Sequence, residues 1–199
     1  QYPFGYGLSY TTFDWEVQRI EANGSPIEAG SSYSLKKDDS LTFYINVTNT
    51  GNRVGKEVVE LYYSAPYTKG GIEKSSVVLA GFAKTSDLKP KETQGLTLTL
   101  AVRDMASYDE DDKNNNGFVG YEVEEGDYQI SLRSDSHHEK KLASSSVLSS
   151  AFACHVPDNG YHYDKDEKSG NPIDNRFIGE DAIDGYPLDG SKEKAQITY

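Results

Sequence analysis

The chain repeatedly alternates apolar and polar residues, and this pattern constrains its fold more than any other feature. In residues 41–47 every second side chain is apolar: Leu41, Phe43, Ile45 and Val47. A period of two is typical of a β-strand with one buried face. The same period returns in residues 96–102 and 128–132, whereas no segment has the 3.6-residue period of an amphipathic helix. The pattern predicts an all-β protein.

Further strands are predicted in residues 13–20, 58–63, 77–83 and 142–148. About seven strands separated by turn residues are typical of an antiparallel immunoglobulin-like β-sandwich, which we place at residues 13–152. Turn-forming residues at 49–52 predict that the strands before and after them are connected antiparallel neighbours. The predicted core contains Phe43, Ile45, Val47, Val59, Leu61, Leu98, Leu100, Ile130 and Leu132.

Composition excludes several classes of partner. The 199 residues include 32 acidic and 20 basic ones, for a formal net charge of −12. Such a charge repels phosphate backbones and anionic lipid, and no apolar run approaches the roughly 20 residues that span a bilayer. We therefore expect neither nucleic acid nor a membrane as a partner. The lone Cys154 cannot form an internal disulfide, and the sequence leaves the localisation open.

Residues 153–199 differ in character from the rest of the chain. Glycines and prolines interrupt a strongly acidic stretch with little periodicity, which predicts a long, mostly irregular tail or linker. The stretch nevertheless contains aromatic residues such as Tyr161, Tyr163 and Phe177, in which disordered segments are poor. We expect residues 155–199 to form no core of their own and to lie along the surface of the sandwich.

Several motifs, taken together, resemble one family. The opening Tyr2-Pro-Phe-Gly-Tyr-Gly-Leu-Ser-Tyr-Thr-Thr-Phe13 resembles the segment that leads from the α/β sandwich domain of glycoside hydrolase family 3, which includes enzymes of the β-glucosidase type, into its fibronectin type III-like domain. Further landmarks follow in the order that family shows: Asn49-Thr-Gly51, Gly55-Lys-Glu-Val-Val-Glu-Leu-Tyr-Tyr63, Leu79-Ala-Gly-Phe-Ala-Lys84, Leu88-Lys-Pro-Lys-Glu-Thr93 and Glu125-Gly-Asp-Tyr128. The similarity covers roughly residues 1–134. It departs at Lys91, where the family usually has glycine.

The resemblance implies a domain plan. Residues 1–12 would end a preceding α/β sandwich domain, residues 13–152 would form the fibronectin type III-like β-sandwich, and residues 153–199 would lead to a following domain. The start at Gln1, inside a motif, predicts a segment of a longer polypeptide. Asn175-Arg-Phe177 and Ile197-Thr-Tyr199 resemble the bridge to a downstream barrel in family members whose two catalytic domains occur in reversed order.

Glycoside hydrolysis requires two suitably spaced carboxyl groups. The resemblance implies that the nucleophilic Asp belongs to a barrel domain and the acid/base residue to the α/β sandwich domain, so this chain would carry no catalytic and no cofactor-binding residue. Asp14-Trp15 partly matches the Ser-Asp-Trp signature of the family's nucleophile. Because the Ser is missing and the pair opens a predicted strand, we expect Trp15 to anchor the core.

Residues 112–117 match the first half of a calcium-binding loop. Asp112, Asn114 and Asn116 occupy its positions 1, 3 and 5, and Gly117 occupies position 6. Position 12, where a bidentate Glu should stand, is Val123. We favour a solvated hairpin loop and predict no metal site, and the sequence leaves calcium binding by this loop open.

The remaining candidate sites are weaker. None of the four histidines, His137, His138, His155 and His162, has a set of metal-ligand partners at a suitable spacing. The loop from Pro66 to Lys74 joins two predicted strands, and such loops can edge a neighbouring pocket. Tyr62, Tyr63 and Tyr67 suggest a sugar-stacking strip, but alternation places Tyr62 and Tyr63 on opposite faces.

The resemblance therefore implies a non-catalytic structural module of a β-glucosidase-type hydrolase, involved in carbohydrate degradation. Its partners would be the catalytic domains of the same polypeptide, which it would brace while shaping the rim of their active site. The alternatives are an autonomous carbohydrate-binding module and a protein-interaction domain. Exposed coplanar aromatic rings would favour carbohydrate binding, whereas a large exposed apolar patch would favour the brace.

Overall fold

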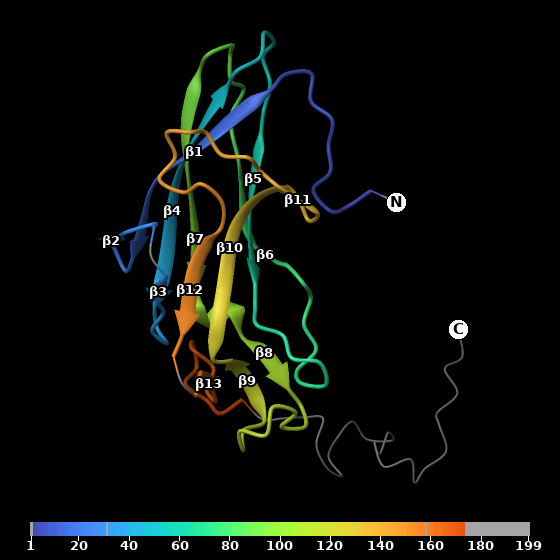
Figure 1. The fold of residues 1–199 in the computed structure, drawn as a ribbon, viewed down its shortest axis with the longest axis vertical. Coiled ribbons are helices and arrows are strands. Elements are labelled where there is room, and N and C mark those ends of the chain that lie inside the picture. Colours follow the sequence, from blue (N-terminus) through green and yellow to red (C-terminus); the bar gives the residue numbers. More distant parts are fainter. Residues whose placement is uncertain (1, 31, 158, 174–199) are drawn as a thin grey trace, which may run out of the picture.

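The computed structural model describes residues 2–30, 32–157 and 159–173, which form two large β-sheets and a small third one (Figure 1). The first sheet contains, in spatial order, β2 (Ser25–Ile27), β1 (Phe13–Ala22), β4 (Ser40–Asn49) and β7 (Thr93–Ala101). The second contains β3 (Tyr33–Ser34), β12 (Phe152–Val156), β10 (Gly126–Asp135), β5 (Val58–Ser64) and β6 (Val78–Lys84), with β11 (His138–Glu139) paired to β10. Nearly all pairs are antiparallel, and the prediction of an all-β sandwich is confirmed.

The core lies between the two large sheets. All nine predicted core residues are buried, each at most 6% exposed, because alternation along β4, β5, β7 and β10 turns one face of every strand inward. Trp15 is completely buried, as expected for a core anchor. Phe43 and Phe152 meet edge-to-face across the core, with their ring centroids 6.1 Å apart.

One predicted strand is absent. Residues 142–148 form turns rather than a strand, and the serine run at 144–146 explains why. The amides of Ala143 and Val147 do donate to the carbonyl oxygens of Trp15 and Val17 on β1, at 2.8 and 2.9 Å. Between these two bonds the chain turns, with the Ser146 amide bonded to the Ala143 carbonyl. The strand that completes the second sheet is β12 instead.

The predicted pairing of the strands at 41–47 and 58–63 is also wrong. β4 pairs with β1 and β7, whereas β5 pairs with β10 and β6 in the other sheet. The connection between them therefore crosses from one sheet to the other. Asn49 fixes its start, since its buried side-chain amide donates to the carbonyl oxygens of Arg53 and Leu88 at 2.7 and 2.8 Å.

The turn at residues 89–92 places a lysine at a position whose backbone favours glycine. The Glu92 amide donates to the Lys89 carbonyl at 3.0 Å, which closes a four-residue turn with Pro90 at its second position. Lys91 occupies the third position with φ 67°. This left-handed conformation is the one that favours glycine, so Lys91 adopts it at a conformational cost.

A small third sheet lies at one end of the sandwich, the lower end in Figure 1, and the sequence patterns did not predict it. It consists of β8 (Ser107–Asp109), β9 (Gly120–Val123) and β13 (Tyr161–Tyr163). A 3-10 turn, η1 (Val102–Met105), precedes it. Strands of three or four residues are too short to show a period of two.

The sheet continues across residue 152, the expected end of the sandwich. In β12 both Cys154 and Val156 are fully buried. The hydroxyls of Tyr161 and Tyr163 donate to the carbonyl oxygens of Leu35 and Lys37, at 2.7 and 3.0 Å, so this part of the tail lies against the sandwich. The sequence expectations for Phe177, 175–177 and 197–199 fall outside the described residues. No helix in the described part is long and apolar enough to cross a membrane.

Candidate functional site

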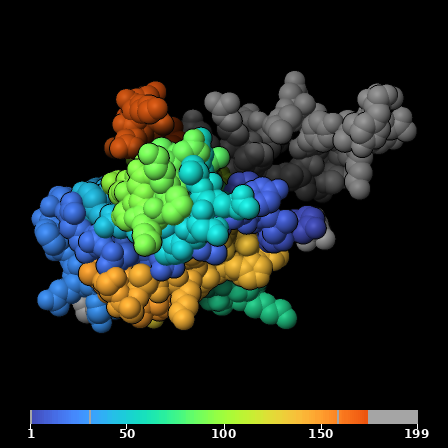
Figure 2. All heavy atoms as spheres, turned by 90° about the horizontal axis from the view of Figure 1, so that it is seen from above, coloured from blue at the N-terminus to red at the C-terminus, as the bar shows by residue number. Residues whose placement is uncertain are grey.

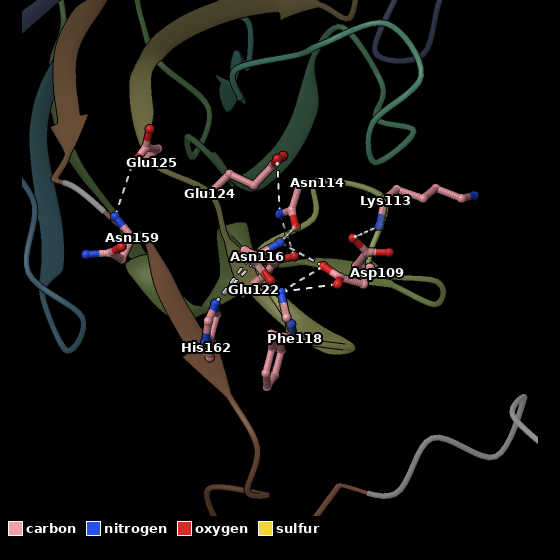
Figure 3. Close-up of polar contacts among 12 residues, drawn as sticks. Asp109, Lys113, Asn114, Asn116, Phe118, Glu122, Glu124, Glu125, Asn159 and His162 are labelled. Atoms are coloured by element: carbon pink, nitrogen blue, oxygen red, sulfur yellow. Dashed lines mark hydrogen bonds and ion pairs between the residues drawn. The ribbon is translucent and has the colours of Figure 1, made fainter.

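A polar cluster lies around the third sheet, where the loop at residues 112–117 meets β9 and β13 (Figure 3). Asp112, with φ 51°, organises this loop. Its carboxylate accepts the backbone amides of Asn116 and Gly117 at 2.8 and 3.1 Å. The first position of the calcium pattern is thus occupied by hydrogen bonds within the loop.

The two asparagines of the same pattern face carboxylates instead of an open cavity. Asn114 donates to Glu122 at 2.9 Å, and Asn116 donates to the other oxygen of Glu122 at 2.6 Å. These bonds tie the loop to β9, as Figure 3 shows. Among the described residues no three acidic, histidine or cysteine side chains are arranged to hold a metal ion. The loop therefore works as a hydrogen-bonded hairpin in this structure.

Glu122 is the centre of the cluster. Its side chain is only 2% exposed, and burial raises the pKa of its carboxyl, an effect that the amides of Asn116 and Asn114 oppose. His162 of β13 lies directly opposite, with Nε2 3.4 Å from the carboxylate. The imidazole also stacks on Phe118, with centroids 4.1 Å apart and planes 2° from parallel. Glu122 therefore helps to hold β13 in place.

The loop at residues 66–74 is anchored beside this cluster. The Lys74 side chain is 5% exposed and forms an ion pair with Glu124. Its ammonium also donates to the Pro66 carbonyl at 2.9 Å, which links the two ends of the loop. Ile72 is buried. The structure thus holds this loop firmly, and a pocket of about 370 Å³ lies between it and the loop at 112–117. The sequence did not predict the pairing of Lys74 with Glu124.

Two of the other histidines each contact one carboxylate through the ring. Nδ1 of His138 lies 2.8 Å from Asp135, and Nδ1 of His155 lies 2.8 Å from Asp127. His137 lies next to His138 at the turn before β11. The structure therefore brings none of them together with the others as a ligand set within the described residues.

Asp14 and Trp15 point to opposite faces of β1. Asp14 is exposed, opposite Thr48 of β4. The buried Trp15 donates from Nε1 to Glu57 at 3.1 Å, and the Lys140 ammonium lies 4.8 Å from its ring centroid. Trp15 thus has a structural environment, and its neighbour Asp14 points away from it.

The three tyrosines do not form a binding platform. Tyr63 faces the core, and Tyr62 is buried on the opposite face of β5, where its hydroxyl donates to Glu60 at 3.0 Å. The prediction that alternation separates these two residues is confirmed. Tyr67 is 53% exposed and donates to Glu73. A flat sugar-stacking strip is absent from these positions.

An exposed apolar segment lies at the N-terminal end. We call residues 2–10 the strap. Its large side chains are 44% to 93% exposed: Tyr2, Phe4, Tyr6, Leu8 and Tyr10. The strap is nevertheless attached to the sandwich, because the Ser136 amide donates to the Phe4 carbonyl at 2.9 Å. Gly5, with φ 85°, lies so close over Glu60 that a Cβ there would be 2.5 Å from the carboxylate. The motif was visible in the sequence, but its exposure was not.

Comparisons with known proteins agree with this fold. Residues 57–136 match the family model of the fibronectin type III-like domain. The chain is 43% identical over 136 residues to β-glucosidase A of Butyrivibrio fibrisolvens, covering 66% of this chain and 15% of that protein. It is 40% identical over 141 residues to a β-glucosidase of Ruminococcus albus, covering 71% of this chain and 13% of that protein.

Solved structures show the same relation. The chain superimposes on a β-glucosidase from Paenibacillus barengoltzii with a TM-score of 0.59 and 35% identity, covering 80% of this chain and 16% of that one. For β-glucosidase 3B from Thermotoga neapolitana the TM-score is 0.52 at 33% identity, with 75% and 17% covered. The chain therefore spans only about a sixth or less of these relatives. Residues 57–136 thus match the fibronectin type III-like domain, and the resemblance to family 3 glycoside hydrolases of the β-glucosidase type that the sequence motifs indicated is confirmed.

Proposed function

We propose that the chain is a non-catalytic structural module that braces the catalytic domains of a β-glucosidase-type polypeptide. The observation that carries the proposal is the strap: its backbone is fixed, yet five large apolar side chains are exposed. Burying one such side chain stabilises by about 1.5–3 kcal/mol. Several large apolar side chains exposed along one short segment are typical of a protein interface. In the β-glucosidases that the chain resembles, this region is a small part of a longer chain, which supports the same role.

Geometry favours this role over autonomous carbohydrate binding. Tyr2 and Tyr6 stack on each other, with centroids 4.7 Å apart, and Tyr108 and Tyr121 meet edge-to-face at 70°. Neither pair offers two coplanar rings to a sugar. The firmly anchored loop at residues 66–74 supports the second part of the proposal, in which this loop shapes the rim of the active site of the parent enzyme.

The brace is tested in the parent polypeptide with the double variant Leu8→Ser, Tyr10→Ser. Both side chains are at least 90% exposed, so the 199-residue chain alone should keep its thermal midpoint. In the parent polypeptide the same change should lower the midpoint by several degrees. The control is Val147→Ser, at 48% exposure outside the strap. Equal midpoints for the double variant and the control would refute the brace.

A second test addresses activity. The purified 199-residue chain should not hydrolyse a nitrophenyl β-glucoside, with or without added calcium, because the family's two carboxyl-bearing motifs are absent from its sequence. Turnover that follows the protein through purification and disappears in Asp14→Asn would overturn the non-catalytic proposal.

A further inference from the structure

A groove of about 600 Å³ runs between the strap and the sandwich. Gly5, Gly7 and Leu8 form its strap side, and the starts of β1 and β5 form the opposite side. Figure 2, which views the molecule from above, shows the dark blue N-terminal residues lying beside the cyan and orange segments that complete this region. The groove lies at the opposite end from the polar cluster around the third sheet.

The groove is basic in an acidic protein. Lys56, Lys84 and Lys140 line it together with the carboxylate of Glu57, and the Glu60 carboxylate lies behind Gly5, although the chain has a net charge of −12. Lys140 lies 3.6 Å from Glu57. The Glu57 carboxylate also accepts the Trp15 Nε1–H, and burial raises the pKa of its carboxyl. The internal carboxylate is therefore already engaged.

Two of the lysines remain available to an outside group. Lys56 lies 3.6 Å from Asp87, but both side chains are well exposed, at 46% and 68%, and such pairs contribute little. Lys84, at the end of β6, is exposed and forms no ion pair with any residue that the structure describes. The groove thus presents positive charge that the described part of the chain does not neutralise.

The rim of the groove is mixed, with the hydroxyl side chains of Ser9, Thr11 and Thr12 beside exposed apolar ones. Leu8 is 90% exposed and lines the groove, and Tyr10 follows it at 93% exposure. Lysines in a groove that an exposed leucine borders match a partner surface that presents a carboxylate next to an apolar contact. Charge complementarity therefore selects an acidic segment, whereas a basic or purely apolar segment would leave Lys84 desolvated without a partner.

We propose that this groove docks an acidic surface segment of a neighbouring domain in the same polypeptide, with its carboxylate held between Lys84 and Lys56. The proposal rests on the brace function and adds the chemistry by which the partner is recognised. In this arrangement the apolar contacts of the strap supply affinity. The lysines orient the partner, since complementary charges fix the register of an interface.

In the first experiment the 199-residue chain is titrated with succinate, a carboxylate probe. Binding is monitored by amide NMR shifts at constant ionic strength. Saturable shifts should concentrate at Gly5, Gly7 and Lys84. Binding should weaken at least tenfold in Lys84→Glu and stay unchanged in the control Lys36→Glu, an exposed lysine outside the groove. Shifts that are absent, or spread evenly over all exposed lysines, would overturn the proposal.

The second experiment separates this inference from the brace itself. In the parent polypeptide Lys84→Glu should lower the thermal midpoint by about 2–4 °C relative to Lys36→Glu, and the difference should shrink at high salt. If Leu8→Ser, Tyr10→Ser destabilises the parent while Lys84→Glu matches its control, the brace stands and the acidic partner is refuted. If neither change has an effect, both proposals fail.

Discussion

Leu98 tests the assignment of the core most directly. Its side chain is 6% exposed and lies opposite Phe43 in the β4–β7 ladder. One of its methyl groups lies 4.0 Å from the position that a Cβ would take at Gly81 of β6, so Leu98 reaches across to the other sheet. Because Gly81 has no side chain, it cannot itself fill the cavity that Leu98→Ala would leave.

The loss of stability expected for Leu98→Ala follows from the burial of this side chain and its position in the sheet. Leu→Ala changes in cores cost about 2–5 kcal/mol. β7 is the outermost strand of its sheet and can relax inward, which places the expected loss at about 2–3 kcal/mol. With a urea m-value of about 2 kcal/mol/M, the unfolding midpoint should fall by about 1–1.5 M.

The assay is urea unfolding, monitored by the fluorescence of Trp15. This is the single tryptophan, and it is completely buried. Leu8→Ala provides the matched control, since this leucine is 90% exposed and its truncation should change the free energy of unfolding by no more than about 0.5 kcal/mol. Equal midpoints for Leu98→Ala and Leu8→Ala would show that Leu98 does not bridge the two sheets.

Three further predictions use the same unfolding assay or simple chemistry. Lys91→Gly should raise the free energy of unfolding by up to about 1 kcal/mol, because glycine adopts the φ of 67° without strain; a loss of stability would contradict the turn geometry. Burial raises the pKa of the Glu60 carboxyl, so the folded state favours the protonated form. The free energy of unfolding of the wild type therefore falls as the pH rises through that pKa. Glu60→Gln should therefore gain stability relative to wild type between pH 4 and pH 7, and a pH-independent difference would refute this. Burial raises the pKa of the Cys154 thiol to about 12, so a disulfide reagent at pH 8 should modify it only after urea unfolding; rapid modification of the native chain would show that β12 opens.

Local patterns predicted the long strands because each carries its own evidence for a buried face. In β4 every second residue from Leu41 onward is buried, and the same alternation identified β7 and β10. Phe152 to Val156 also alternates, with buried residues at 152, 154 and 156, but the preceding serines and the following Pro157 made this stretch look like the start of a linker.

Pairing and the candidate sites depended on information that local patterns lack. Turn residues at 49–52 indicate a change of direction, but the choice of sheet depends on long-range contacts, such as the bond from the Asn49 side chain to the Leu88 carbonyl. The calcium pattern was read correctly as residue types, yet Asn114 and Asn116 bind Glu122 rather than a common centre. The contact of Lys74 with Glu124 joins residues 50 positions apart, and spacing alone does not reveal it.

The place of β12 has a consequence for biosynthesis. This strand lies between β10 and β3, and Tyr161 and Tyr163 bond to carbonyl groups 126 residues earlier in the chain. While the ribosome is still translating this region, β3 and the connection after it have no partner on that side. Contacts between such distant residues form slowly, so the nascent chain exposes an open sheet edge until residue 163 has left the exit tunnel. Chaperone binding during synthesis should therefore concentrate on chains stalled before residue 152 and decline on those stalled well after residue 163.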